Sequence, residues 1–145
     1  MRRLLIVSCS GTKDHAAELL PALARYTGAY YQMIKGSKAS LPEIVILSAL
    51  YGFIAPEFLT YDYNHKMDED RAGELLGDPR TVEQWESLVV GEFDEVFVCA
   101  GAEYRRVIEP LVYRLLTGRT KIETVSGGIG FHRSQLKAWL SRGAS

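Results

Sequence analysis

The chain has 145 residues, of which 47% are hydrophobic and 24% charged, and this composition suits a single domain over residues 1–145. Its net charge of −1 provides no global positive field for nucleic acid, although a local basic stripe remains compatible with it. No run approaches the roughly 18 apolar residues of a membrane span. The apolar run after Met1 is too short for a secretion signal. We therefore expect a cytoplasmic protein with no membrane partner.

Four short apolar runs, rich in Val and Ile, predict buried parallel strands. They cover residues 4–7, 44–47, 96–99 and, more weakly, 121–125. Helical patterns lie between them, over 22–35 with a break at 26–28, from 81, over 107–116 and over 131–141. Alternating strands and helices predict right-handed crossovers and an α/β fold. We expect three α/β/α layers around a four-stranded, mainly parallel sheet of order 2-1-3-4, as in flavodoxin-like proteins.

Local signals predict several helix ends. Thr27 is expected to cap the second half of the broken helix, and Thr81 with Gln84 has the spacing of a capping box. Pro110 lies inside an apolar stripe, where it should either kink the helix or mark its first turn.

Ligands of open parallel sheets bind beyond the carboxyl ends of the strands, where the strand order reverses. In the predicted order this crevice lies between strands one and three and faces loops 8–13 and 99–104. The first loop contains hydroxyls, amides and a lysine, which together can bind an anion. The alternative is a polar loop that is simply solvated. The candidate binding residues of the two loops are Ser10, Lys13, Gly101 and Tyr104.

The cysteines Cys9 and Cys99 would end neighbouring strands of this sheet. Cys9 is therefore a candidate nucleophile, but a buried cysteine is more often an inert small hydrophobe, and both roles stay open. The two cysteines lack metal-ligand spacing and the histidines are scattered, so we expect neither a metal nor a cofactor.

The long segment 48–68 follows the second strand and is predicted to be irregular, which is typical of functional loops. Its tyrosines offer flat faces for stacking on a base, and its carboxylates Glu57 and Asp62 are candidate general acids or bases. Packing of these aromatics onto the domain is the alternative. The binding candidates of this segment are Ser48, Tyr51, Gly52 and Tyr61.

A glycine-rich turn precedes the last helix and loosely resembles a phosphate-binding turn. Its candidates are Gly128, Gly130 and, in the first helical turn, His132. A solvated histidine and a turn shaped only by sterics are the alternatives.

Together these motifs resemble an uncharacterised domain family of bacteria, archaea and phages. The resemblance rests on Cys-Ser-x-x-Lys at 9–13, Ala-x-Tyr-Thr-Gly at 24–28, Leu-Ser-Ala-x-Tyr-Gly at 47–52, Tyr-Asp at 61–62, Gly-Ile-Gly at 128–130 and Trp-Leu at 139–140. It covers nearly the whole chain.

A more distant resemblance is to the central domain of archaeosine synthase. It rests on the Cys-Ser-x-x-Lys loop and on Ser48, Gly52, Pro56 and Glu57. That domain has a uracil-DNA-glycosylase-like fold, so the resemblance implies such a fold and a pocket for a nucleobase, nucleoside or nucleotide, free or within DNA or RNA. The chain lacks the RNA-binding domain of archaeosine synthase and the Asp-Pro-Tyr signature of uracil glycosylases.

The leading hypothesis is an enzyme that acts on a modified nucleobase, nucleoside or nucleotide, by base modification or N-glycosidic chemistry. The alternative is a non-catalytic module that binds nucleotide or nucleic acid. A plain protein-interaction domain would instead present an exposed apolar patch.

Overall fold

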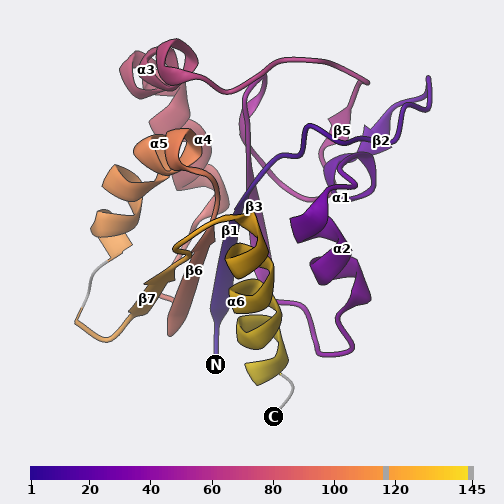
Figure 1. The fold of residues 1–145 in the computed structure, drawn as a ribbon. Coiled ribbons are helices and arrows are strands. Elements are labelled where there is room, and N and C mark those ends of the chain that lie inside the picture. The colour runs from indigo at the N-terminus through magenta and orange to yellow at the C-terminus, as the bar shows by residue number, and fades with distance from the viewer. Residues whose placement is uncertain (116–117, 144–145) are drawn as a thin grey trace.

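A computed structural model describes residues 1–115 and 118–143 and shows a mixed five-stranded sheet with helices on both faces (Figure 1). The strand order is β4-β3-β1-β6-β7, and every neighbouring pair is parallel except β4 with β3. The strands of this sheet are β1 (Arg3–Ser8), β3 (Glu43–Ser48), β4 (Gly52–Ile54), β6 (Glu95–Cys99) and β7 (Lys121–Thr124). A separate antiparallel pair joins β2 (Leu20–Pro21) and β5 (Leu59–Thr60).

The helices cover the sheet in two groups because alternate residues of β1 face opposite sides. Leu4 and Ile6 pack with α3 (Glu69–Gly77), α4 (Pro79–Leu88) and α5 (Ala102–Val112). Leu5 and Val7 pack with α1 (Ala22–Arg25), α2 (Ala29–Gly36) and α6 (Ile129–Arg142). A 3₁₀ turn, Tyr113–Leu115, follows α5, and the Leu116 of the predicted stripe lies outside the described residues. Strand β1 is consequently buried on both faces at the centre of the domain.

The expected four-stranded sheet is wrong in strand number because the segment after β3 folds back as β4. Gly52 has a φ of +79°, a conformation that favours glycine, and a side chain there would collide with Gln84. Gln84 also accepts a hydrogen bond from the Phe53 amide at 3.1 Å and donates one to the Tyr51 carbonyl at 3.0 Å. The antiparallel edge strand thus depends on a side chain from a distant helix. Two further residues of the predicted irregular segment form β5.

Two predicted helix caps are also wrong. Gly28, not Thr27, is the N-cap of α2. Helix α4 starts at Pro79, and its N-cap Asp78 accepts a hydrogen bond from the Arg80 amide at 2.9 Å. Thr81 therefore lies inside this helix and donates to the Leu75 carbonyl at 2.6 Å.

Pro110 lies near the end of α5, eight residues after its start, so it does not mark the first turn. Among the described helices, none has the length and apolar character that a bilayer crossing requires.

Arg25 ties the loop after β1 to the β2–β5 pair. Its side chain is fully buried, and its guanidinium donates five hydrogen bonds of 2.6 to 3.3 Å. The acceptors are the carbonyls of Asp14, Ala16, Glu18 and Thr60 and the Thr60 hydroxyl. A planar guanidinium can serve all of them, whereas the point charge of a lysine cannot.

We predict that Arg25→Ala lowers the free energy of unfolding by at least about 3 kcal/mol, since several buried carbonyls lose their donor and each loss costs about 1–3 kcal/mol. Urea unfolding followed by circular dichroism measures this change. Arg80→Ala is the control, because Arg80 forms an exposed ion pair with Asp78 that is worth about 0–1 kcal/mol. Equal effects of the two substitutions would contradict the role assigned to Arg25.

Candidate functional site at the carboxyl edge of the sheet

The site candidate lies where β1, β3 and β6 end and where α2, α5 and α6 begin. Each of these helices has a glycine at its N-cap, Gly28, Gly101 or Gly128, and no side chain caps it. Helix N-termini present unpaired N–H groups and a partial positive charge. This edge of the sheet therefore favours negative charge.

Five tyrosines, which we call the tyrosine cluster, gather at this edge: Tyr26, Tyr31, Tyr51, Tyr63 and Tyr104. Tyr26 and Tyr31 are fully buried, and the others are half-buried. The Tyr63 ring stands edge-on to the rings of Tyr26 and Tyr51, with centroids 6.4 and 5.4 Å apart. The cluster brings together residues from α1, α2, α5 and the segment after β3.

A directed chain of hydroxyl groups runs through the tyrosine cluster. The Ser48 hydroxyl oxygen accepts hydrogen bonds from the Leu50 and Tyr51 amides, both at 3.1 Å. Its own proton therefore points to Tyr63 Oη at 2.8 Å, and Tyr63 donates in turn to Tyr26 Oη at 2.5 Å. The Tyr26 hydroxyl is left with a proton to donate at the end of this chain.

Burial favours the protonated form of four of these phenols. It raises the pKa of Tyr26 to about 12, and it also raises the pKa values of Tyr31, Tyr63 and Tyr104. At neutral pH these four residues consequently supply neutral hydroxyl groups and aromatic rings.

Lys13 is the cation of this site. Its side chain is only 9% exposed, and an antiparallel bridge between Lys13 and Tyr26 holds its backbone. The Nζ atom lies 4.6 Å from the ring centroid of Tyr63 and 3.5 Å from the Gly11 carbonyl. Within residues 1–115 and 118–143 it forms no ion pair with a carboxylate. A buried ammonium with such weak protein partners is suited to bind an anion.

Cys9 lies beside this lysine-containing loop, and its sulfur is 3.1 Å from Tyr104 Oη. Because burial raises the pKa of Tyr104, its phenol keeps a proton that it can donate to the sulfur. The loops after β1 and β6 thus meet at this contact. Cys99 is fully buried and burial raises the pKa of its thiol, so it is the inert member of the pair.

The structure does not bring the two predicted carboxylates into the tyrosine cluster. Glu57 is exposed and lines a different hollow with Pro42 and Glu43, at the amino end of β3. Asp62 is partly exposed and accepts from His15 Nδ1 at 3.0 Å, which joins the loop after β1 to the loop after β5.

The remaining predicted binding residues have varied surroundings. Ser10 packs against Gly28, where an added side chain would meet its hydroxyl. Tyr61 is 64% exposed, and its amide donates to Tyr51 Oη at 3.1 Å. Gly128 and Gly130 are exposed at the start of α6.

His132 is buried rather than solvated. Its Nδ1 lies 2.7 Å from Tyr30 Oη, and the two rings are stacked. It lies on the same edge of the sheet as the tyrosine cluster, but within the described ranges it forms no hydrogen bond with the cluster.

Sequence reasoning missed Tyr26, Tyr30 and Tyr31 as residues of this edge. Tyr26 stands in the Ala-x-Tyr-Thr-Gly motif, which is the sequence signal that could have identified it. Tyr30 and Tyr31 lie in the predicted helical pattern over 22–35, where an aromatic residue is ordinary, so no sequence signal distinguishes them.

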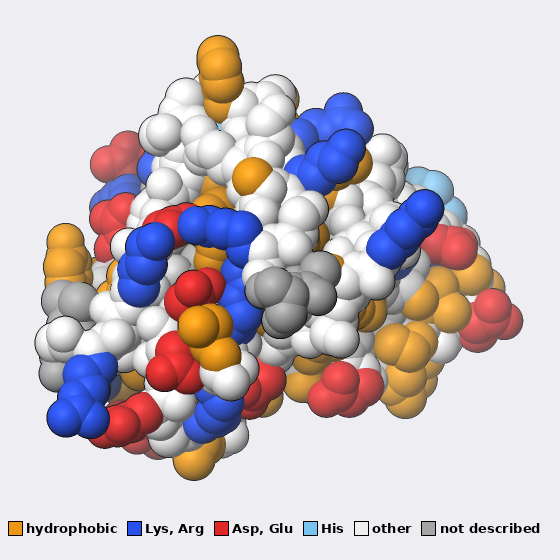
Figure 2. Space-filling view, turned by 90° about the horizontal axis from the view of Figure 1, so that it is seen from below, with side chains coloured by type: hydrophobic (Ala, Val, Ile, Leu, Met, Phe, Trp, Pro, Cys, Tyr) orange, Lys and Arg blue, Asp and Glu red, His pale blue; other side chains and the backbone are white. Residues whose placement is uncertain are grey.

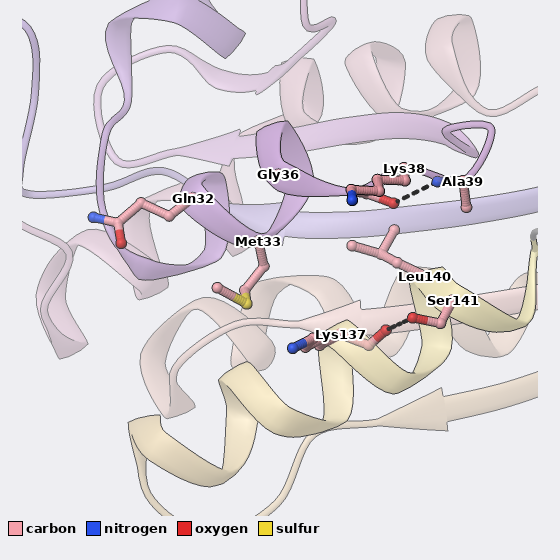
Figure 3. A pocket seen from close by; sticks show the side chains of 9 residues that line it. Gln32, Met33, Gly36, Lys38, Ala39, Lys137, Leu140 and Ser141 are labelled. Atoms are coloured by element: carbon pink, nitrogen blue, oxygen red, sulfur yellow. Dashed lines mark hydrogen bonds between the residues drawn. The ribbon is translucent and has the colours of Figure 1, made fainter.

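Other surfaces differ from this edge. A hollow of about 510 Å³ separates the later turns of α2 and α6, with Met33 and Leu140 among its lining and Lys38 and Lys137 beside them (Figure 3). None of the predicted site residues lines it. Viewed from the side of the N-terminus, basic and acidic side chains are interleaved (Figure 2), and the ion pairs Arg2–Glu43 and Arg3–Glu95 lie at this end. Among the described residues, no cluster of His, Cys, Asp or Glu could hold a metal ion.

Fold and site together define an α/β protein whose carboxyl sheet edge carries a buried lysine, a cysteine and a tyrosine cluster. The chain belongs to a family of unknown function, DUF6884, whose model matches residues 4–141. A comparison with curated proteins found no match.

We predict that stability falls as the pH rises from about 10 towards 12. The folded protein favours the neutral phenols, so their contribution is complete below the unfolded-state pKa of about 10 and is lost above it. Urea unfolding at about pH 8 and about pH 11 measures the difference. The Tyr26→Phe variant should lose less stability over this range than the wild type, and an equal or flat profile would contradict the prediction.

Proposed function

We propose that the carboxyl edge of the sheet binds a nucleobase, nucleoside or nucleotide, free or within DNA or RNA. The observation that carries this proposal is Lys13, a buried cation whose described partners are a carbonyl and aromatic rings. An anionic or electron-rich group of the ligand is the partner that the ammonium requires.

The tyrosine cluster suits the ring of such a ligand. The half-buried Tyr51, Tyr63 and Tyr104 offer ring faces for stacking on the base, and the buried Tyr26 holds Tyr63 in place through the bond between their hydroxyls. The distant resemblance to the central domain of archaeosine synthase, and to its uracil-DNA-glycosylase-like fold, supports the same class of ligand.

Cys9 is the candidate catalytic residue for modification of a bound base. Its sulfur faces the donor Tyr104, and the same loop carries Lys13. The geometry favours Cys9 over Glu57, which lies at the amino end of β3, while Asp62 reaches the site loop only through His15.

A non-catalytic binding module is the second candidate. It is favoured by the observation that, in the described part of the chain, no carboxylate contacts the tyrosine cluster. Such a module would use the same lysine and tyrosines for recognition without a general acid or base.

We predict that Lys13→Met weakens binding of the ligand at least about tenfold, equivalent to about 1.4 kcal/mol. Thermal shift and calorimetry against nucleobases, deazaguanines, nucleosides, nucleotides and short single-stranded DNA and RNA would identify the ligand and measure the loss. The unliganded variant should be as stable as the wild type or more so, because a buried charge is replaced by an apolar side chain.

Lys137→Met is the control, since Lys137 is exposed on α6 and lines the separate hollow. Absence of binding by every compound, or equal affinity of Lys13→Met and wild type, would overturn the proposed site.

We predict that conversion of the identified ligand, followed by chromatography, is abolished by Cys9→Ser and is unchanged in Glu57→Gln. Asp62→Asn should alter turnover by less than about tenfold, because Asp62 contacts the loop and not the cluster. Wild-type binding without turnover would support the binding module. Loss of turnover in Glu57→Gln would restore the carboxylate mechanism in place of Cys9.

A further inference from the structure

A second group of polar side chains lies at the same edge, beside the tyrosine cluster. It consists of Tyr30 on α2, Arg105 on α5 and His132 on α6, and we call it the Tyr30 site. Each residue stands within the first four positions of its helix, and each helix has a glycine N-cap. Three helix N-termini therefore direct their partial positive charge towards this group.

His132 is 5% exposed, and its Nδ1 is bonded to Tyr30 Oη at 2.7 Å. Its other ring nitrogen, Nε2, is buried and has no hydrogen-bond partner among the described residues. An unpartnered buried polar atom costs about 1–3 kcal/mol and is rare in folded proteins. The described residues supply no hydrogen-bond partner for this nitrogen, so a bound ligand is a candidate partner.

Arg105 has the same deficiency. Its Nη1 donates to the Val125 carbonyl at 3.3 Å, whereas its buried Nε has no partner in the described part of the chain. No ion pair joins its guanidinium to a described carboxylate. Its charge acts on Tyr30, where it opposes the rise in pKa that burial causes. The two unpartnered nitrogens thus belong to side chains that both interact with Tyr30.

We infer that the Tyr30 site binds an oxyanion, the phosphate group of the ligand. This inference rests on the proposed function and names its substrate class: a nucleotide or a phosphorylated nucleic-acid end, in preference to a free base or nucleoside. Arginine and histidine donors at helix N-termini are the groups that recognise phosphate in proteins. Lys13 and the tyrosine cluster then hold the base, while Arg105 and His132 hold the phosphate.

The hydrogen bond between Tyr30 and His132 is consistent with binding of an anion at this site. Burial raises the pKa of Tyr30, so its phenol keeps a proton, and His132 Nδ1 is the one hydrogen-bond partner of Tyr30 Oη in the described part of the chain. In the tautomer that accepts this proton at Nδ1, the imidazole proton is on Nε2, and both unpartnered nitrogens are donors. Each of them can donate a hydrogen bond to a phosphate oxygen.

Inorganic phosphate tests the subsite without a nucleoside. We predict ³¹P NMR line broadening and a thermal shift with sodium phosphate, relative to sodium chloride of equal ionic strength. In Arg105→Gln the affinity should fall at least about tenfold, since a charge-assisted hydrogen bond is lost. Arg106→Gln is the matched control, because Arg106 is the next residue of α5 and pairs with Glu103 on the surface.

His132→Asn is the second variant. Its amide can retain the bond to Tyr30 but has no counterpart of Nε2, so phosphate affinity should fall while stability is kept. Absence of phosphate binding by the wild type, as expected if water alone serves the two nitrogens, would overturn the inference. Equal phosphate affinity of wild type and Arg105→Gln would do so too, because it would mark an adventitious ion only.

Matched pairs of each nucleoside and its 5′-monophosphate separate this inference from the proposed function. If both hold, the monophosphate binds at least about tenfold more tightly, and Arg105→Gln removes this advantage but leaves nucleoside binding unchanged. Equal affinity within every pair would overturn the phosphate subsite and leave the base site standing. Phosphate binding without binding of any base or nucleoside, and with no nucleotide bound more tightly than inorganic phosphate, would support the subsite and overturn the proposed function.

Discussion

The buried guanidinium of Arg25 organises the part of the chain on which the site depends. Its five hydrogen bonds hold the backbone of residues 14–18 and the strand β5 against α1. The adjacent bridge between Lys13 and Tyr26 places the lysine over the ring of Tyr63. These contacts hold the loop after β1 in place, and the Lys13 side chain is largely out of solvent. Five hydrogen bonds satisfy the buried charge of Arg25, whereas Lys13 has a single long hydrogen bond and ring contacts.

The two ends of the sheet differ in whether the basic side chains named here pair with carboxylates. At the amino end, Arg2 pairs with Glu43 and Arg3 with Glu95. At the carboxyl end, the hydrogen bonds of Lys13 and Arg105 within the described ranges go only to carbonyls, and three glycine-capped helices begin there. The net charge of −1 hides this difference because it sums over the whole surface. A local field that favours anions follows from the arrangement, not from the composition.

The sequence located the edge of the sheet but misjudged which residues meet there. Lys13, Cys9 and Tyr104 were predicted to face one another across two loops, and a contact of 3.1 Å joins Cys9 to Tyr104. Glu57 was grouped with them because its loop follows the second predicted strand, yet the chain turns back at Gly52 and carries Glu57 to the amino end of β3. The edge strand β4 has only three residues and leaves no clear pattern in the sequence. The turn before it depends on contacts with Gln84 from α4.

Short-range physics thus determined the outline of this protein from the sequence. Apolar runs of four or five residues specify buried strands, their alternation with helical patterns specifies a mainly parallel sheet, and parallel strands place their following loops on one edge. Only the tertiary structure decided which side chains are buried without a partner. Among the described residues, Lys13 lacks a carboxylate partner, and Arg105 Nε and His132 Nε2 lack a hydrogen-bond partner. These environments arise from elements that lie far apart in the chain. The burial and the hydrogen bonding of a side chain depend on all of its neighbours in space, and a local sequence pattern does not specify those neighbours.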